Sequence, residues 1–221
     1  MRFAFALAVL FSLSASAQAL KTDDEKTLYA IGYLVAVRSN LPALSLKPNE
    51  LELVKRGLSD AAGGKKAQIE PEAQMEKMNT FAQARTSAGA EKEKAAGKEY
   101  ADKAAKEPGV TKLPSGLIYK TLTPGKGQSP AATDKVKVNY EGKLTNGTVF
   151  DSSYKRGQPA EFGLNQVIKC WTEGVQKMKV GEKARLVCPS DIAYGDHGHP
   201  PTIPGGATLV FDVELLGIEG K

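Results

Sequence analysis

The chain has 221 residues, of which 41% are hydrophobic and 25% are charged. A charged fraction of this size is typical of globular proteins, and the length allows one or two domains. The net charge is +5, from 30 Lys and Arg against 25 Asp and Glu, but acidic residues are interleaved with basic ones nearly everywhere. Because the sequence has no basic tail or stripe, we expect no nucleic-acid partner. Two cysteines and two histidines without metal-ligand spacing predict no bound metal.

Residues 1–19 have the pattern of a secretory signal peptide. Arg2 is followed by an apolar run over residues 3–13 and then by small residues, with cleavage expected after Ala17 or Ala19. The run is short for a permanent anchor in a hydrocarbon core of about 30 Å, so an uncleaved anchor is the weaker alternative. We therefore expect no stable membrane span, and a mature protein that is periplasmic, secreted or on the cell surface.

Residues 20–70 are predicted to form two short helices. Thr22 and Glu25 have the spacing of a capping box at the start of the first helix. Pro48 suits the first turn of the second helix. Two helices of this length make a poor core by themselves, so they need a partner surface. One alternative is packing on the C-terminal part of the chain. We favour a homodimer through residues 20–70, because the segment that follows would hold them away from that part.

Residues 71–107 are rich in Ala, Glu and Lys and contain no strand pattern, so we predict one long solvated linker helix. Pro71 suits its first turn, and at 1.5 Å per residue the helix would reach roughly 55 Å. Gly89 and Gly97 each cost about 1 kcal/mol relative to Ala within a helix, so we expect bending or fraying there. A disordered charged linker is the alternative, because apolar anchors are few.

Residues 108–221 change character, since Gly and Pro become frequent and apolar residues alternate with polar ones as in β-strands. In two runs the apolar residues share one strand face: Val136, Val138 and Tyr140, and then Leu209, Phe211, Val213 and Leu215. Asn146-Gly147, between two apolar runs, is a strong signal for a tight hairpin. A single short helix is predicted from apolar residues at spacings of four, four and three: Val167, Trp171, Val175 and Met178. An antiparallel sheet around one short helix is an α+β domain, which we predict here.

Five motifs occur in order over roughly residues 110–219: VNYEG at 138–142, GTVFDSS at 147–153, VIKCWTEG at 167–174, AYG at 193–195 and ATLVFDV at 207–213. In this register they resemble the FKBP-type peptidyl-prolyl cis/trans isomerases. The segments before them extend the similarity to the macrophage infectivity potentiator group of exported, dimeric isomerases. The resemblance implies an FKBP-like isomerase domain over residues 108–221.

The resemblance also implies a pocket with apolar walls, Trp171 as its floor, and the loop after Tyr194 above it. The catalytic residues that it implies are Asp151, Tyr194, Phe150, Tyr140, Ile168, Trp171 and Phe211. The substrate-binding residues that it implies are Val167, His199, Ile203 and Phe162. We expect the Tyr194 hydroxyl and the Ile168 N–H to bind substrate carbonyls, and Asp151 to help polarise the twisting amide.

Two positions depart from the family pattern. Ala160 stands where many members have a pocket aromatic, so that wall is expected to be lower and the affinity for macrolide-type inhibitors is left open. Cys170 replaces the glycine that commonly precedes the tryptophan. We predict a disulfide between Cys170 and Cys188, worth about 3 kcal/mol in the chain-entropy model, which an exported protein would keep. Two buried free thiols are the alternative.

Single residues of the pocket also have simpler interpretations. Taken alone, Trp171, Phe211 and Tyr140 are each most often core residues. Asp151 after a strand is equally typical of a turn or a helix cap. Only their joint register with Tyr194 favours a site.

Two functions follow from these features. The first is an isomerase that accelerates Xaa-Pro isomerisation in exported proteins as they fold, which belongs to class EC 5.2.1.8. The barrier of about 18–20 kcal/mol comes from amide resonance, so breaking it requires no nucleophile, metal or cofactor. A dry apolar pocket favours the twisted amide, which has less charge separation than the planar one. The alternative is a dimeric periplasmic chaperone that binds unfolded chains, with weak or incidental isomerase activity.

Overall fold

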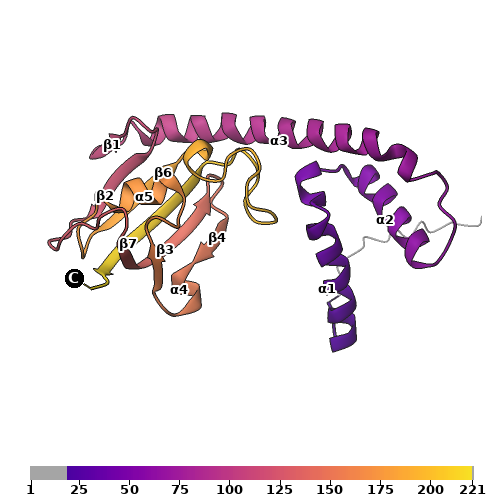
Figure 1. The fold of residues 1–221 in the computed structure, drawn as a ribbon, viewed down its shortest axis with the longest axis horizontal. Helices are drawn as coiled ribbons and strands as arrows, with labels where there is room; N and C mark the ends of the chain where they lie inside the picture. Colours follow the sequence, from indigo (N-terminus) through magenta and orange to yellow (C-terminus); the bar gives the residue numbers. More distant parts are fainter. Residues whose placement is uncertain (1–18, 221) are drawn as a thin grey trace, which may run out of the picture.

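The computed structural model describes residues 19–220, with N-terminal helices, a long helix and a C-terminal β-sheet unit in chain order (Figure 1). The predicted signal peptide, residues 1–19, lies outside the described residues except for its last position. Within the described part of the chain, no helix combines the length and apolar character needed to cross a membrane.

The N-terminal helices are α1 (Asp23–Arg38) and α2 (Pro48–Ala62), joined through the short 3-10 helix η1 (Leu41–Leu44). The predicted capping box starts α1, where the Glu25 N–H donates to the Thr22 hydroxyl at 3.1 Å and the Glu25 carboxylate accepts from the Thr22 N–H at 3.0 Å. Neither helix contains a buried residue. Apolar side chains on both helices are therefore exposed in the single chain.

The long helix α3 (Met75–Ala104) follows the 3-10 turn η2 (Glu72–Gln74) and spans the distance between the N-terminal helices and the sheet (Figure 1). Its 30 residues correspond to about 45 Å, so the helix is shorter than expected at both ends. Pro71 caps η2 instead of opening the long helix. The segment is nonetheless helical, and the alternative of a disordered linker does not describe it.

The C-terminal part of α3 packs on the sheet, which the charged sequence did not predict. Ala101 and Ala104 of α3 form a small buried cluster with Ile118, Val187 and Val210. The expectation that the helix only separates the two ends of the protein was therefore incomplete. Small residues allow α3 to approach the sheet closely. Because alanine and glycine are only weakly hydrophobic, the periodicity of apolar residues does not predict this contact.

Gly97 of α3 also lies close to the sheet unit. A Cβ atom at this position would lie 2.7 Å from the Thr208 Cβ, whereas a Cβ atom at Gly89 would meet nothing within 4 Å. The two glycines expected to bend the helix thus differ. Gly97 is buried against the sheet unit, and only Gly89 is free of such contact.

The C-terminal unit is a seven-stranded sheet with antiparallel pairing throughout, and the short helix α5 (Lys169–Val175) lies against it (Figure 1). The strands are β1 (Val110–Lys112), β2 (Ile118–Thr123), β3 (Lys135–Leu144), β4 (Val149–Ser152), β5 (Ala160–Gly163), β6 (Lys183–Cys188) and β7 (Leu209–Ile218). Their order is β1-β2-β6-β7-β3-β4, with β5 also paired to β3. The predicted α+β class is confirmed.

The core lies between this sheet and α5. On β3 and β7 the predicted inner faces are buried: Val136, Val138 and Tyr140, and Leu209, Phe211, Val213 and Leu215. Trp171, Val175 and Met178 pack against them from the α5 segment. The predicted hairpin joins β3 to β4, where Gly147 has φ of +87° and the Thr148 N–H donates to the Asn146 side chain at 2.9 Å.

Cys170 and Cys188 form a disulfide, with their Cα atoms 5.8 Å apart. Both cysteines are fully buried. The bridge ties the start of α5 to the end of β6, and so fixes the residue beside Trp171 to the sheet.

The two glycines of α3 provide a test of this packing. We expect Gly89→Ala to raise the free energy of unfolding by roughly 0.5–1 kcal/mol, because Ala is the better helix former. We expect Gly97→Ala to lower it by about 1–3 kcal/mol, because the new methyl group overlaps Thr208. Urea unfolding followed by circular dichroism measures both. Equal stabilisation by the two substitutions would contradict the close contact.

Candidate active site

A cleft of about 420 Å³ opens at the sheet face beside α5. Its walls are Tyr140, Phe150, Asp151, Phe162, Gln166, Val167, Ile168, Trp171, Tyr194 and Phe211. These residues come from β3, β4, β5, the segment before α5, α5 itself, the loop after η3 (Ser190–Ile192), and β7. The fold therefore brings together side chains that are far apart in the sequence.

Trp171 lies at the centre of an aromatic cluster below this cleft and is only 4% exposed. Its indole meets three rings edge to face, with centroid distances of 5.1 Å to Tyr140, 5.5 Å to Phe162 and 5.4 Å to Phe211. Each such pair contributes roughly 0.5–1.5 kcal/mol beyond the burial of area. Because three rings contact the indole, the Trp171 side chain is held in place and forms a rigid floor for the cleft.

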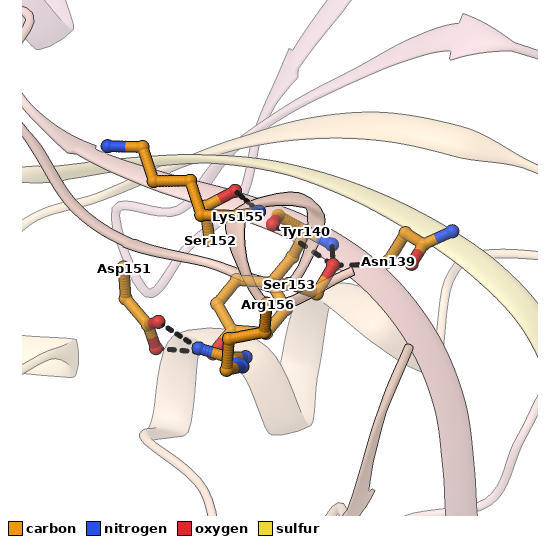
Figure 2. Close-up of polar contacts among 7 residues, drawn as sticks. All are labelled: Asn139, Tyr140, Asp151, Ser152, Ser153, Lys155 and Arg156. Atoms are coloured by element: carbon orange, nitrogen blue, oxygen red, sulfur yellow. Dashed lines mark hydrogen bonds and ion pairs between the residues drawn. The ribbon is translucent and has the colours of Figure 1, made fainter. Parts of the chain in front are cut away.

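The polar edge of the cleft is a group of three side chains, Tyr140, Asp151 and Arg156 (Figure 2). The Tyr140 hydroxyl donates to one carboxylate oxygen of Asp151, and Arg156 Nη1 pairs with the other. Arg156 Nη2 donates to the Tyr140 hydroxyl oxygen at 2.9 Å, and the guanidinium carbon lies 5.4 Å from the centre of the Tyr140 ring. Both oxygens of Asp151 are thus occupied by fixed donors.

This arrangement sets the charges of the group. Burial by itself raises the pKa of Asp151, but the hydrogen bonds from Tyr140 and Arg156 and the Arg156 charge outweigh it and lower the pKa below 3.8. Burial, with the hydrogen bond to Asp151, raises the pKa of Tyr140. The hydrogen bonds to Tyr140 and Asp151 raise the pKa of Arg156. At neutral pH the group holds one carboxylate, one guanidinium and one neutral phenol.

The short helix α4 (Ser153–Arg156) places Arg156 in this group. The Lys155 N–H donates to the Ser152 hydroxyl at 3.4 Å at the start of the turn. Gly157, with φ of +72°, ends it in the left-handed conformation that glycine adopts without strain. Arg156 is not among the residues that the motifs predict for the site. The available signal was a Ser cap followed by a Gly stop, which predicts a single helical turn directly after Asp151.

A buried serine joins α4 to β3 (Figure 2). The Tyr140 N–H donates to the Ser153 hydroxyl at 2.9 Å, and that hydroxyl donates to the Asn139 side-chain oxygen at 3.2 Å. Ser153 is fully buried. The turn that carries Arg156 is therefore fastened to the strand that carries Tyr140, which fixes the distance between the two side chains.

Tyr194 closes the other side of the cleft and is 38% exposed. Partial burial, followed by the nearby negative charge of Asp151, raises the pKa of Tyr194. The hydroxyl therefore remains protonated and able to donate at neutral pH.

His199 and Ile203 are not among the side chains that line the cleft. They face each other in a turn, where the His199 N–H donates to the Ile203 carbonyl at 2.8 Å and the reverse bond is 3.0 Å. Ile203 is buried in the core, and the His199 ring lies against Tyr194 with centroids 5.5 Å apart. Their direct contact with substrate stays a prediction, and their position favours an effect through Tyr194.

The remaining predicted residues are brought together at the cleft. Phe150, Val167 and Ile168 line it, as does Gln166, which the motifs do not predict. Ala160 does not line the cleft. Phe162, two residues further on β5 and on the same face of the strand, supplies the ring at this wall.

Family comparisons match two stretches of the chain. A family model described as FKBP-type peptidyl-prolyl cis-trans isomerase matches residues 126–216, and one described as the domain amino terminal to FKBP-type peptidyl-prolyl isomerase matches residues 24–121. The chain is 40% identical over 215 residues to the FKBP-type peptidyl-prolyl cis-trans isomerase FkpA of Escherichia coli (strain K12), which covers 92% of this chain and 79% of that protein.

Two further similarities extend over most of the chain. The peptidyl-prolyl cis-trans isomerase Mip of Coxiella burnetii is 37% identical over 217 residues, covering 93% of this chain and 91% of its own. The crystal structure of FkpA from Escherichia coli superposes with a TM-score of 0.66 at 39% identity, covering 90% of this chain and 98% of that one. The similarity therefore includes the N-terminal helices and α3 as well as the sheet.

The charge of Asp151 provides a test of the polar group. Because its pKa is lower in the folded than in the unfolded chain, its interactions stabilise the fold above the ordinary value of 3.8 and are lost as the pH falls through the folded value. We expect Asp151→Asn to lower the melting temperature at pH 7, and the gap from wild type to shrink below pH 3.8. The control is Asp191→Asn, at an exposed position in η3. A gap for Asp151→Asn that does not depend on pH would contradict the assigned ion pair.

Proposed function

The chain belongs to the FKBP-type peptidyl-prolyl cis-trans isomerase family and is a peptidyl-prolyl isomerase, and we propose that its cleft over Trp171 is the catalytic site for Xaa-Pro segments of exported proteins. The observation that carries this proposal is the aromatic cluster of Trp171, Tyr140, Phe162 and Phe211 beside an ionised, fully hydrogen-bonded Asp151. The alternative of a chaperone with only incidental isomerase activity is not favoured.

The chemistry of the cleft suits rotation about an amide bond. The barrier of about 18–20 kcal/mol comes from conjugation of the nitrogen with the carbonyl. A proline ring seated on the Trp171 face would lose water from its amide, and the planar, more charge-separated amide loses more by this than the twisted one. No bond is made or broken, and the proposal calls for no cofactor.

Donors around the cleft would orient the peptide. The Tyr194 hydroxyl and the Ile168 N–H bind substrate carbonyls in this proposal. Ile168 is the N-cap residue of α5, so its N–H lies outside the hydrogen-bond ladder of the helix. Because these two donors hold the peptide on both sides of the rotating bond, the peptide loses less orientational entropy when it reaches the twisted state.

Asp151 acts in this proposal as a fixed charge at the rim. Because Tyr140 and Arg156 occupy both oxygens of Asp151, the carboxylate has a fixed orientation. Its negative charge then interacts with the dipole of the substrate amide as the amide twists. Val167 and Phe162 contact the substrate as walls, while His199 and Ile203 act by supporting the loop of Tyr194. Macrolide-type inhibitors would occupy the same cleft, with Phe162 in place of the ring that Ala160 lacks.

We also propose that the mature protein is a homodimer through residues 20–70. Leu28 and Ile31 on α1 are 69% and 56% exposed, and Leu53 on α2 is 58% exposed. Neither helix buries a residue in the single chain, and apolar surface of this extent is typical of an interaction site. A second copy of the same helices would cover it.

The domain division remains part of the proposal: a signal peptide over residues 1–19, the dimerisation domain over 20–70, the linker helix over 71–107 and the isomerase domain over 108–221. A signal peptide would direct the protein to the periplasm or beyond. Its clients would then be exported chains, in which uncatalysed proline isomerisation takes tens of seconds.

The catalytic roles are tested by isomerisation of a short Xaa-Pro peptide with the full mature chain. We expect Tyr194→Phe and Asp151→Ala each to lower kcat/KM by about tenfold or more, the effect of losing one hydrogen bond or charge that acts in the transition state. Tyr154→Phe is the matched control, because Tyr154 lies outside the cleft and its hydroxyl donates to Glu214 at 3.3 Å. Unchanged turnover in a folded Tyr194→Phe variant would refute the role of its hydroxyl.

The homodimer is tested by light scattering on the mature protein. We expect the mass of two chains, and the mass of one chain for a Leu28→Glu and Ile31→Glu double variant, because buried carboxylates in an apolar interface are strongly disfavoured. Activity on a short peptide serves as the control and should stay unchanged, since both residues lie outside the cleft. A wild-type mass of one chain would end this part of the proposal.

A further inference from the structure

The loop that carries Tyr194 is held by α3. We define the active-site loop as residues 194–208, which precede β7. Lys94, on α3, forms an ion pair with Asp196, with 2.6 Å between Nζ and Oδ1. Asp196 is two residues from Tyr194. The contact therefore joins the linker helix directly to the part of the loop that borders the cleft.

A second contact fixes the returning side of the loop. Gly206 has φ of +76°, and a Cβ atom there would lie within 3.0 Å of the Ala90 Cα on α3. Only glycine permits this approach of two backbones. The Gly206 N–H donates to the Gly195 carbonyl at 2.8 Å. Contacts therefore run from α3 through Gly206 to Gly195, the residue next to Tyr194.

A third contact lies where the loop enters β7. Thr208, which is 5% exposed, packs against Gly97 of α3. Three residues further, Phe211 forms part of the cleft wall. Ala90, Lys94 and Gly97 are spaced by four and three residues, so they share one face of the helix. That face contacts the active-site loop at Asp196, Gly206 and Thr208.

We propose that Lys94 is a positioning residue for the isomerase reaction: its ion pair with Asp196 holds the active-site loop so that the Tyr194 hydroxyl faces the bound peptide. This inference rests on the proposed function, because it acts through the role given there to Tyr194. It makes α3 a working part of the site as well as a linker. The close contacts of Gly206 with Ala90 and of Thr208 with Gly97 hold the base of the loop, and Lys94 holds the segment next to the tyrosine.

The expected effect is modest. The Lys94 and Asp196 side chains are 33% and 58% exposed, and partly exposed ion pairs are weak. We expect Lys94→Met in the full mature chain to lower kcat/KM on a short Xaa-Pro peptide by roughly two- to fivefold, the range that such a pair supports. Lys98→Met is the matched control, because Lys98 also loses an ion pair of 2.6 Å, but its partner Asp102 lies within α3 and not in the active-site loop.

A double-mutant cycle separates positioning from general stabilisation. If Lys94 acts through the Tyr194 hydroxyl, Lys94→Met should have no further effect in a Tyr194→Phe chain. The exchanged pair, Lys94→Asp with Asp196→Lys, should recover most of the activity that either single change removes. A kcat/KM for Lys94→Met equal to that of wild type, or losses that multiply with those of Tyr194→Phe, would overturn the inference.

The same experiment keeps this inference apart from the proposed function. If the wild-type chain has no isomerase activity, the proposed function itself is refuted. A Tyr194→Phe variant with wild-type turnover would remove the role of the hydroxyl and, with it, positioning through that group. If Tyr194→Phe is impaired and Lys94→Met is not, only the role of Lys94 fails. The fluorescence of Trp171, the only tryptophan in the chain, reports whether the cleft is intact in each variant.

Discussion

The packing of Trp171 is the constraint on which the cleft depends. Three rings contact its indole edge to face, and each ring comes from a different strand: Tyr140 from β3, Phe162 from β5 and Phe211 from β7. The rings stand close to perpendicular to the indole, and all three line the cleft together with Trp171. The result is an apolar hollow kept open by the core itself, which is what a pocket for a proline ring requires.

The polar side of the cleft is joined to the aromatic cluster through Tyr140 and is stabilised further by α4. Tyr140 belongs to both, since its ring packs on Trp171 and its hydroxyl donates to Asp151. Ser153 fastens α4 to β3, and α4 presents Arg156 to the carboxylate. A shift of the aromatic floor would therefore also move the charged group. The disulfide from Cys170 to Cys188 adds a covalent tie directly beside Trp171, between α5 and β6.

Much of the sheet unit could be predicted from the sequence, because strand alternation and the Asn146-Gly147 turn are local signals. Most residues that line the cleft lie in the five motifs, whereas Phe162 and Gln166 lie between them. Arg156 was missed because a single helical turn has no periodicity to detect. His199 and Ile203 lie between the motifs, where the sequence does not say which way a turn folds, so their contact with substrate stays a prediction.

The packing of α3 was hidden for a different reason. Apart from Lys94, its contact face consists of Ala90, Gly97, Ala101 and Ala104, small residues that a search for apolar periodicity passes over. Such residues gain little from burial of area, yet they allow backbone approach, and the close contacts of Gly97 and Gly206 depend on having no Cβ. A charged, alanine-rich helix thus serves as spacer over one part of its length and as structural wall over another. In this chain the second part contacts the loop of Tyr194 at Asp196, Gly206 and Thr208, and through these contacts a shift of the helix would bear on the loop that borders the cleft.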